Sequence, residues 1–571
     1  MLWTDDIRVV VGLDFGVIYS GFSFCHVSDD NCDIRTNYEW PGEEGPYRTN
    51  TVLQYDDDFE NVKSWGHNAL YLKPKRNKFN NDGRKRIVEL FKLYLGNCSD
   101  KLKPKLPEPL TYKKAIADYL REMGKLIKET ISKIWAGINF TENVLLVLTV
   151  PAEYSVTDKA IMRECIFNAG LISEKNSERL QFTTESEAVA IYCFCSGLRE
   201  HILTKPGTNY MIVECADNTV EITTRKLLEE NQLGEVTERT GDFCGSTFID
   251  KKFIELLERE VGKSAVDLFS EKYYDQLQYL VQKFRQDVTL LFTGKNPDFS
   301  YEFDLANFTP ALLRYATSPE KDLTEEKDWV IELDFNTVKS MFDPIIDRII
   351  GMIHVQLNNS SGECSAIFLA GDFSQSKYLL KRVREEFGQS VENISVPNLS
   401  LAAVSRGATL YGKSLYESRN LKNMNNSKCV IVTRVLKYTF GIKVSPLCEY
   451  GDPLDRLTSD GRIHKFLRIV ERKTEVTIGQ EFIVENLIPI CPDQTQMSFE
   501  IYYTNEQNAV YCDEPGMKLL GKLFINLPDE HLEINRSCLF YLSFGDMEIK
   551  ARAFNQMNGQ NYQTMFELDD Y

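Results

Sequence analysis

Residues 9–24 read VVVGLDFGVIYSGFSF, and this stretch decides the fold that the sequence predicts. A run of β-branched residues ends in the carboxylate of Asp14, a short turn containing Gly16 follows, and a second run mixes apolar and small polar residues. Two such runs joined by a tight turn are typical of a β-hairpin. We therefore predict two antiparallel strands, with Asp14 at the turn end of the first one.

The same pattern recurs at residues 210–223, which read YMIVECADNTVEIT. Here too an apolar run ends in a carboxylate, that of Glu214, and a turn leads into a second run. This repetition indicates that one fold motif is used twice. Two hairpins of this form facing one another would bring two carboxylates and two tight turns to one cleft, which suits a phosphate chain and Mg²⁺.

The chain changes character near residue 413. Before it, β-branched runs alternate with longer helical patterns, such as those at 113–135 and 158–169, and this alternation indicates an α/β architecture. From residue 429 onward, short aromatic and β-branched runs are separated by glycine and proline turns, a pattern typical of an all-β sandwich or barrel. The stretch 413–428 is rich in Asn and Ser, and we predict a polar linker there.

Composition excludes several classes of partner. The 571 residues carry 66 basic and 84 acidic side chains, a net charge of −18, which is the wrong sign for binding nucleic acid or an anionic membrane. No apolar run approaches the ~20 residues of a membrane-spanning helix, and no signal peptide is recognisable. The cysteines form no Cys-x-x-Cys pair, so we expect free thiols in the cytoplasm.

Five short motifs then occur in an order that points to a known family. They are DFG at 14–16, LTVPA at 148–152, TESEA at 184–188, IFLAGDF at 367–373 and RGATLYG at 406–412. In these motifs the chain resembles the heat shock protein 70 family, in its divergent member-12-like branch, within the actin-like ATPase superfamily. The resemblance covers nearly the whole chain.

The resemblance implies a domain organisation. A two-lobed actin-like nucleotide-binding domain, built from a duplicated ribonuclease-H-like fold, is expected at 1–412, with lobes at about 1–205 and 206–388 and with 389–412 returning to the first lobe. After the linker at 413–428, residues 429–571 are expected to form a β-sandwich similar to the family's substrate-binding domain. The chain ends at Tyr571, soon after the last predicted strand, so we expect no helical lid.

The resemblance also implies the site residues. Asp14 and Glu214 match the carboxylates on the Mg²⁺ side, and with Glu185 they form the predicted catalytic set. Lys92 is either a phosphate-facing lysine or an ordinary surface lysine. The predicted ATP or ADP contacts come from four turns: Gly16, Val17, Ile18 and Tyr19; Ala216, Asp217, Asn218 and Thr219; Gly241, Gly245 and Ser246; and Gly371, Asp372 and Phe373.

These turns depart from the family pattern. Val17 and Ile18 stand where threonines usually donate hydroxyl groups to phosphate, and the second turn has lost its glycines. Asp217 brings a carboxylate to the expected place of the γ-phosphate, where like charges repel by ~1 kcal/mol in water and by several at lower dielectric. We therefore expect Mg-ATP binding to be weakened.

Two functions follow from these residues. The first is an ATP-binding, heat shock protein 70-like protein with a chaperone-like or regulatory role in the stress response, in which hydrolysis is weak or absent and protein or peptide clients are the partners. The alternative is a pseudo-ATPase interaction module that no longer needs nucleotide. A sugar or acetate kinase on the shared fold is disfavoured, because the C-terminal β-domain has no use in that chemistry.

Overall fold

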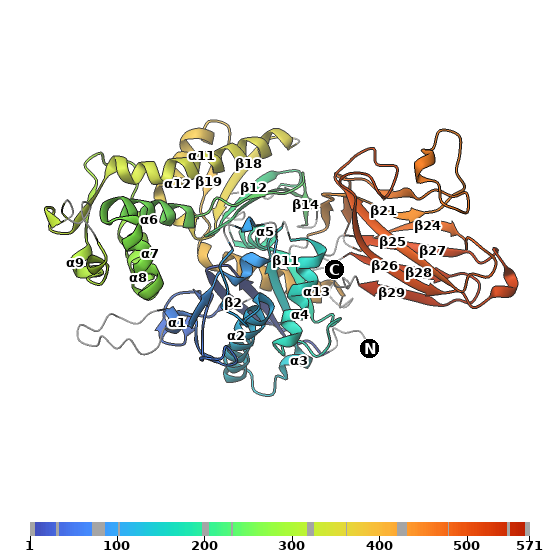
Figure 1. Ribbon diagram of the computed structural model, residues 1–571, viewed down its shortest axis with the longest axis horizontal. Helices are drawn as coiled ribbons and strands as arrows, with labels where there is room; N and C mark the ends of the chain where they lie inside the picture. The colour runs from blue at the N-terminus through green and yellow to red at the C-terminus, as the bar shows by residue number, and fades with distance from the viewer. Residues whose placement is uncertain are drawn as a thin grey trace. The chain divides into compact units, whose positions relative to one another are not determined.

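The computed structural model describes residues 6–565, except for 30–32, 71–85, 97, 101–102, 153, 197–204, 230–231, 317–321, 323–324, 361, 420–430, 478 and 545–548. The chain forms two compact units, whose elements are labelled in Figure 1. Unit 1 comprises Met1–Glu153, Cys165–Leu227 and Thr240–Cys429. Unit 2 comprises Tyr154–Glu164, Leu228–Arg239 and Val430–Tyr571.

Unit 1 contains two mixed β-sheets, and sheet I is built on the first predicted hairpin. Its strands run in the order β11-β10-β1-β2-β3, and β6 also pairs with β2. Their bounds are β1 (Val9–Phe15), β2 (Tyr19–His26), β3 (Arg35–Thr36), β6 (Thr49–Asn50), β10 (Val144–Val150) and β11 (Leu180–Thr184). Strand β1 is parallel to β10 and antiparallel to β2. Strands β1 and β10 are buried throughout, which explains why they read as continuous apolar runs.

Sheet II is built on the second predicted hairpin in the same way. It contains β12 (Asn209–Cys215), β13 (Val220–Leu227), β15 (Thr240–Asp242), β18 (Cys364–Ala370) and β19 (Asn393–Ser395). Strand β12 is antiparallel to β13 and parallel to β18, as β1 is to β2 and β10. The two sheets therefore repeat one arrangement, as the sequence predicted.

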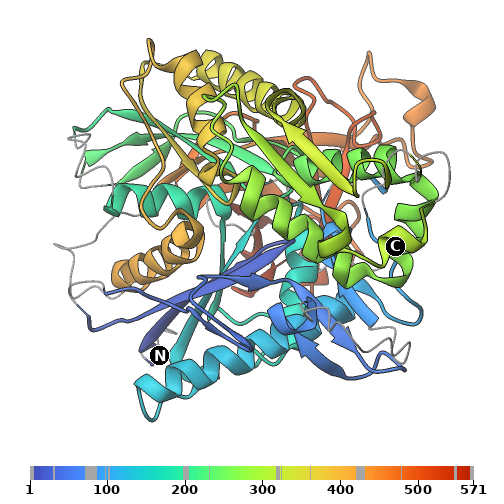
Figure 2. The same cartoon turned by 90° about the vertical axis from the view of Figure 1, so that its left-hand side faces the viewer.

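The principal helices of unit 1 are α2 (Tyr112–Ile134), α5 (Glu185–Ser196), α6 (Thr247–Val261), α7 (Lys263–Lys272), α8 (Tyr274–Phe284), α11 (Phe335–Asn359), α12 (Lys377–Phe387) and α13 (Ala403–Arg419). Of these, α5, α11, α12 and α13 contact strands of the two sheets. Helix α4 (Val156–Asn168) includes residues of both units. Helix α13, orange in Figure 2, lies against β1, β10 and α5. A Cβ on Gly12 would stand 2.3 Å from the carbonyl oxygen of Ser405, so the approach of α13 to β1 requires glycine there.

Shorter elements complete unit 1 and help to line its cavities. Strand β4 (Glu39–Trp40) pairs with β5 (Glu43–Glu44), β7 (Val52–Tyr55) pairs with β8 (Val62–Trp65) and β9 (Arg86–Glu89), and β16 (Ser300–Asp304) pairs with β17 (Val330–Asp334). Short helices are α1 (His67–Leu70), α3 (Phe140–Asn143), α9 (Leu305–Phe308), η1 (Phe91–Tyr94), η4 (Arg285–Thr289), η5 (Leu312–Arg314), η6 (Phe373–Gln375) and η7 (Ser400–Ala402). Among the described residues, no helix is both long and apolar enough to cross a membrane.

Unit 2 is mainly two four-stranded antiparallel sheets. One has the order β22-β21-β25-β26 and the other β24-β27-β28-β29. Their bounds are β21 (Thr439–Val444), β22 (Lys465–Val470), β24 (Gln480–Leu487), β25 (Gln496–Thr504), β26 (Lys518–Asn526), β27 (Cys538–Phe544), β28 (Lys550–Asn555) and β29 (Asn561–Met565). Phe440 and Ile501 of the first sheet and Phe540 and Leu542 of the second belong to one buried core.

The core of unit 2 is joined to segments from earlier in the chain. Strand β20 (Thr433–Val435) pairs with β23 (Glu475–Thr477), and β14 (Leu233–Glu235) lies beside β20. The Glu235 carboxylate accepts a hydrogen bond of 2.8 Å from the backbone N–H of Val435, and Arg472 lies 3.1 Å from the Glu238 carboxylate. Unit 2 is therefore not made of the C-terminal residues alone.

The structure corrects the predicted linker at 413–428. Helix α13 continues to Arg419, and Lys413 and Ser414 are buried within unit 1. Residues 420–428 lie outside the described residues. The polar composition of 413–419 misled the prediction, because the long stem of a lysine can be buried while its ammonium group finds a hydrogen bond. The Lys413 ammonium donates to the backbone carbonyl of Asp29.

Candidate functional site

The candidate site lies at the turns of the two repeated hairpins. Asp14 and Glu214 are the second-last residues of β1 and β12, and as whole residues they are 5% and 2% exposed. The turns that follow are closed in the same way, because the Gly16 N–H donates to the carbonyl of Tyr19 at 3.1 Å and the Ala216 N–H to that of Thr219 at 2.9 Å. The structure therefore places both carboxylates at equivalent positions.

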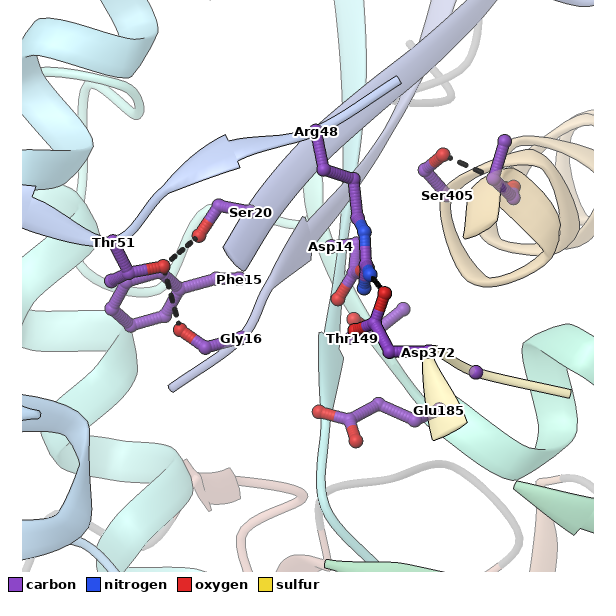
Figure 3. Close-up of polar contacts among 12 residues, drawn as sticks. Asp14, Phe15, Gly16, Ser20, Arg48, Thr51, Thr149, Glu185, Asp372 and Ser405 are labelled. Carbon is purple, nitrogen blue, oxygen red and sulfur yellow. Dashed lines mark hydrogen bonds and ion pairs between the residues drawn. The ribbon is translucent and has the colours of Figure 1, made fainter. Parts of the chain in front are cut away.

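Arg48 lies between the two sheets at this point. Its guanidinium group is 3.8 Å from an Asp14 carboxylate oxygen and is also ion-paired with Asp372, which follows β18 of sheet II (Figure 3). The side chains of Arg48 and Asp372 are only 13% and 18% exposed. No role was predicted for Arg48, because nothing in its local sequence pattern distinguishes it from a surface residue.

Glu185 joins the same cluster through Lys92. The Lys92 ammonium lies 3.3 Å from the Glu185 carboxylate and donates to the backbone carbonyl of Phe15. Lys92 is 2% exposed, so the interpretation of it as a surface lysine is wrong. Its charge is directed at a carboxylate and at the first turn.

Burial raises the pKa values of two carboxyl groups in this cluster, those of Asp14 and Glu214. The pKa of Asp14 rises from 3.8 to about 7, because burial and the nearby carboxylates outweigh the opposing effects of Arg48 and Lys92. Burial likewise raises the pKa of Glu214 well above its usual value, and the charge of Glu185 adds to the effect. The three predicted catalytic carboxylates are thus close enough to influence one another. Their role stays a prediction.

The second turn packs against the segment that precedes α6. The Ser246 hydroxyl lies 3.3 Å from an Asp217 carboxylate oxygen, and the Thr247 hydroxyl donates to the side-chain oxygen of Asn218 at 2.5 Å. Gly245 donates its N–H to the backbone carbonyl of Asn218. Gly241 instead lies on β15, opposite Glu221. Burial raises the pKa of Asp217, against the effect of two arginines, Arg285 and Arg48.

The turn after β18 closes the site from the other side. Gly371 has a positive φ of 82°, and a Cβ there would stand 2.4 Å from the carbonyl oxygen of Cys215, so this turn requires glycine. A cavity of about 230 Å³ opens beside it. Five of the predicted nucleotide contacts line this cavity, namely Tyr19, Asp217, Ser246, Asp372 and Phe373, together with Arg48 and Arg285. Val17, Ile18 and Asn218 instead line a neighbouring cavity.

Arg285 is a second arginine at this site for which no role was predicted. It is the first residue of the short helix η4, which follows α8. Its guanidinium group donates to the Asp250 carboxylate, with a distance of 2.9 Å from Nε to Oδ2. Another nitrogen of the same group lies 3.3 Å from the Tyr19 hydroxyl. The Arg48 guanidinium carbon lies 5.5 Å from the centre of the Tyr19 ring, so Tyr19 is flanked by two cations.

The chain is similar to curated proteins along almost its whole length. It is 23% identical to "Heat shock 70 kDa protein 12A" of Mus musculus and to that of Homo sapiens, and each match spans 99% of this chain and 92% of the relative. It is 22% identical to human "Heat shock 70 kDa protein 12B", over 98% of this chain and 91% of the relative. No protein-family profile matches the chain. Along almost its whole length the chain is therefore similar to divergent, member-12-like proteins of the heat shock protein 70 family.

The mixed α/β content and the several mixed sheets of the chain are compatible with an actin-like ATPase fold. The family commonly binds ATP with Mg²⁺, so the fit of the site to these groups can be tested. One carboxylate oxygen each of Glu214 and Asp372 is buried without a hydrogen-bond partner among the described residues. A buried carboxylate oxygen requires a proton or a cation, so the cluster fits a cation.

The number and type of the available ligand atoms indicate which kind of cation the cluster could bind. Among the described residues, no three His, Cys, Asp or Glu side chains are placed to hold one metal ion together. Mg²⁺ commonly keeps several waters and uses only one or two carboxylates, which Asp14 and Glu214 can supply. The described residues of this cluster therefore fit a hydrated Mg²⁺ better than a fully enclosed metal.

Proposed function

We propose that the chain binds ATP or ADP with Mg²⁺ in a cleft between two actin-like lobes, built on sheet I and sheet II, and that it acts as a chaperone-like or regulatory protein in the cytoplasm. The observation that carries the proposal is the repeated hairpin. It puts Asp14 and Glu214 at equivalent turns beside a cavity that two arginines line. Within the described part of the chain, one carboxylate oxygen each of Glu214 and Asp372 is buried there without a hydrogen-bond partner.

In this proposal each group has a distinct role. Asp14 and Glu214 would hold Mg²⁺, which when bound would neutralise charge on the phosphates. Arg48 and Arg285 would supply positive charge to the phosphate chain, where the family's threonine hydroxyls are replaced by the apolar side chains of Val17 and Ile18. Positioned donors stabilise charge in phosphoryl transfer, so the loss of two hydroxyls supports weak or absent hydrolysis.

Unit 2 is proposed to be a β-sandwich that contacts protein or peptide clients. Its two antiparallel sheets share one core, and the strands alternate buried and more exposed positions, as in the pattern of β27. The relatives' names carry the family assignment and do not specify a client. Client binding is therefore proposed from the resemblance of the C-terminal residues to the substrate-binding domain.

One observation favours the alternative, a pseudo-ATPase interaction module. Arg48 is already paired with Asp14 and Asp372, so the charge that would meet a phosphate is satisfied within the protein. A ligand phosphate would have to compete with two carboxylates for this guanidinium group. If that competition fails, the cleft is held closed by its own ion pairs and has no use for nucleotide.

Calorimetric titration with ATP and with ADP separates the two functions. We expect saturable binding that requires Mg²⁺ and that weakens about tenfold or more in Arg48→Met. Lys252→Met is the matched control, because Lys252 pairs with Glu255 at 2.8 Å but both side chains are exposed. Absence of binding to the wild-type chain would support the pseudo-ATPase, and phosphate release from bound ATP would show that hydrolysis is retained.

A further inference from the structure

A second cavity in unit 1, of about 320 Å³, has a different character from the candidate nucleotide cavity. Its wall is mainly apolar and includes Val52, Leu70, Leu93, Phe248, Ile254 and Val281. These residues come from the segments around β7 and β9 on one side and from α6 and α8 on the other. Small-molecule sites are typically apolar cavities of ~300 Å³ or more with a few polar groups.

Two cationic side chains line this cavity, and both have partners within the protein. The guanidinium group of Arg285 is bonded to the Asp250 carboxylate and to Tyr19. The Lys251 side chain is exposed, and its ammonium lies 4.7 Å from the centre of the Phe248 ring. Both cations at the cavity therefore already have a favourable partner.

Glu89 is the exception. It is the last residue of β9 and lines the cavity, but its carboxylate makes no hydrogen bond or ion pair with any residue in the part of the chain that the structure describes. Burial raises the pKa of Glu89 from 4.5 to about 7, although Arg285 acts in the opposite direction. An ionised carboxylate in such a place is costly unless a cation accompanies it.

We propose that this cavity binds a small organic cation, a protonated amine with an apolar body, whose ammonium group pairs with the carboxylate of Glu89. The apolar wall takes the body of the ligand, and Glu89 supplies the one unsatisfied charge. An anionic ligand is opposed, because it would meet the carboxylates of Glu89 and Asp250. The amine site does not depend on the proposed nucleotide function, because its charge is that of Glu89, which lines only this cavity. The two cavities are neighbours: Tyr19, Asp250, Gln282 and Arg285 line both, and the predicted nucleotide contacts Val17, Ile18 and Asn218 line this one.

The test compares three probes that share one apolar chain. Hexylammonium, hexanol and hexanoate are titrated calorimetrically into the full chain at a pH of about 8, where a carboxyl with a pKa near 7 is mostly ionised. We expect hexylammonium to bind at least about tenfold more tightly than hexanol, and hexanoate to bind most weakly. Equal binding of the amine and the alcohol, or strongest binding of hexanoate, would overturn the proposal.

Three variants connect the result to the cavity. In Glu89→Gln, which keeps the shape of the side chain, hexylammonium should lose its advantage over hexanol. Glu60→Gln removes the same charge from an exposed position and should leave binding unchanged. Ile254→Trp should fill the cavity and weaken the amine and the alcohol alike. Retained preference for the amine in Glu89→Gln, with native circular dichroism, would also overturn the proposal, whatever the chain does with ATP.

Discussion

Replacing Arg48 by Met should destabilise unit 1 by about 3 kcal/mol. At 3.8 Å from Asp14 and an effective dielectric of about 20, the attraction of one pair is ~4 kcal/mol. Removing one partner of a buried pair typically costs ~3–5 kcal/mol, because the other charge stays buried. The side chains keep 13% exposure at Arg48, 7% at Asp14 and 18% at Asp372, so we expect the lower end of this range.

Urea unfolding followed by tryptophan fluorescence measures this loss selectively. All five tryptophans precede residue 430 and fall in segments of unit 1, so their emission reports on that unit. The measurement is made at about pH 8, because the pKa of Asp14 is raised to about 7 and its carboxylate must be ionised for the pair to form.

Two comparisons make the result decisive. Lys252→Met should change the unfolding free energy by no more than ~0.5 kcal/mol, because exposed pairs contribute little. Asp372→Asn combined with Arg48→Met should cost less than the sum of the two single changes, because each removes the same interaction. The ion pair does not hold the two sheets together if Arg48→Met unfolds with the same free energy as the wild type. The same conclusion follows if the losses of unfolding free energy in Arg48→Met and Asp372→Asn are additive in the double variant.

Three further outcomes can be measured. Asp217→Asn removes the carboxylate beside the second turn and should tighten Mg-ATP by ~1 kcal/mol in calorimetry; unchanged affinity would mean that this turn does not face the nucleotide. Arg536→Met should lower the unfolding free energy of unit 2 by ~3 kcal/mol or more, measured by denaturant unfolding followed by near-ultraviolet circular dichroism. The fully buried guanidinium group donates to four backbone carbonyls, which would lose their partner. Burial raises the pKa of Glu89 from 4.5 to about 7, so the folded state prefers the protonated form and loses stability as the pH rises through this interval. Between about pH 5 and pH 8 the wild type should therefore lose up to ~3 kcal/mol more than Glu89→Gln, and parallel pH profiles would contradict the assignment.

The resemblance that the sequence predicted is confirmed by the relatives, and the repeated hairpin is confirmed by the structure. Both depend on short patterns along the chain. The helix predicted at 113–135 is α2 (Tyr112–Ile134), because apolar positions three or four residues apart define one buried face. The carboxylates Asp14 and Glu214 could be named in advance for the same reason, since each ends an apolar strand before a turn.

The remaining features depend on contacts between distant residues. Residues 413–419 are polar, but tertiary packing keeps them helical, so the predicted linker begins too early. Residues 228–239 belong to unit 2, where Glu235 accepts a hydrogen bond from the backbone N–H of Val435 at the end of β20, and no pattern within that segment indicates this contact.

The sequence by itself therefore determined the hairpins, the helices and the identity of the carboxylates, because these follow from periodicity and from the order of neighbouring residues. Only the tertiary structure decided which charges meet. Arg48 reaches Asp372 across 324 positions of the chain, and Arg285 reaches Tyr19 across 266. Such pairs depend on how distant segments of the chain pack together. The local sequence around either arginine does not indicate which residue it will contact.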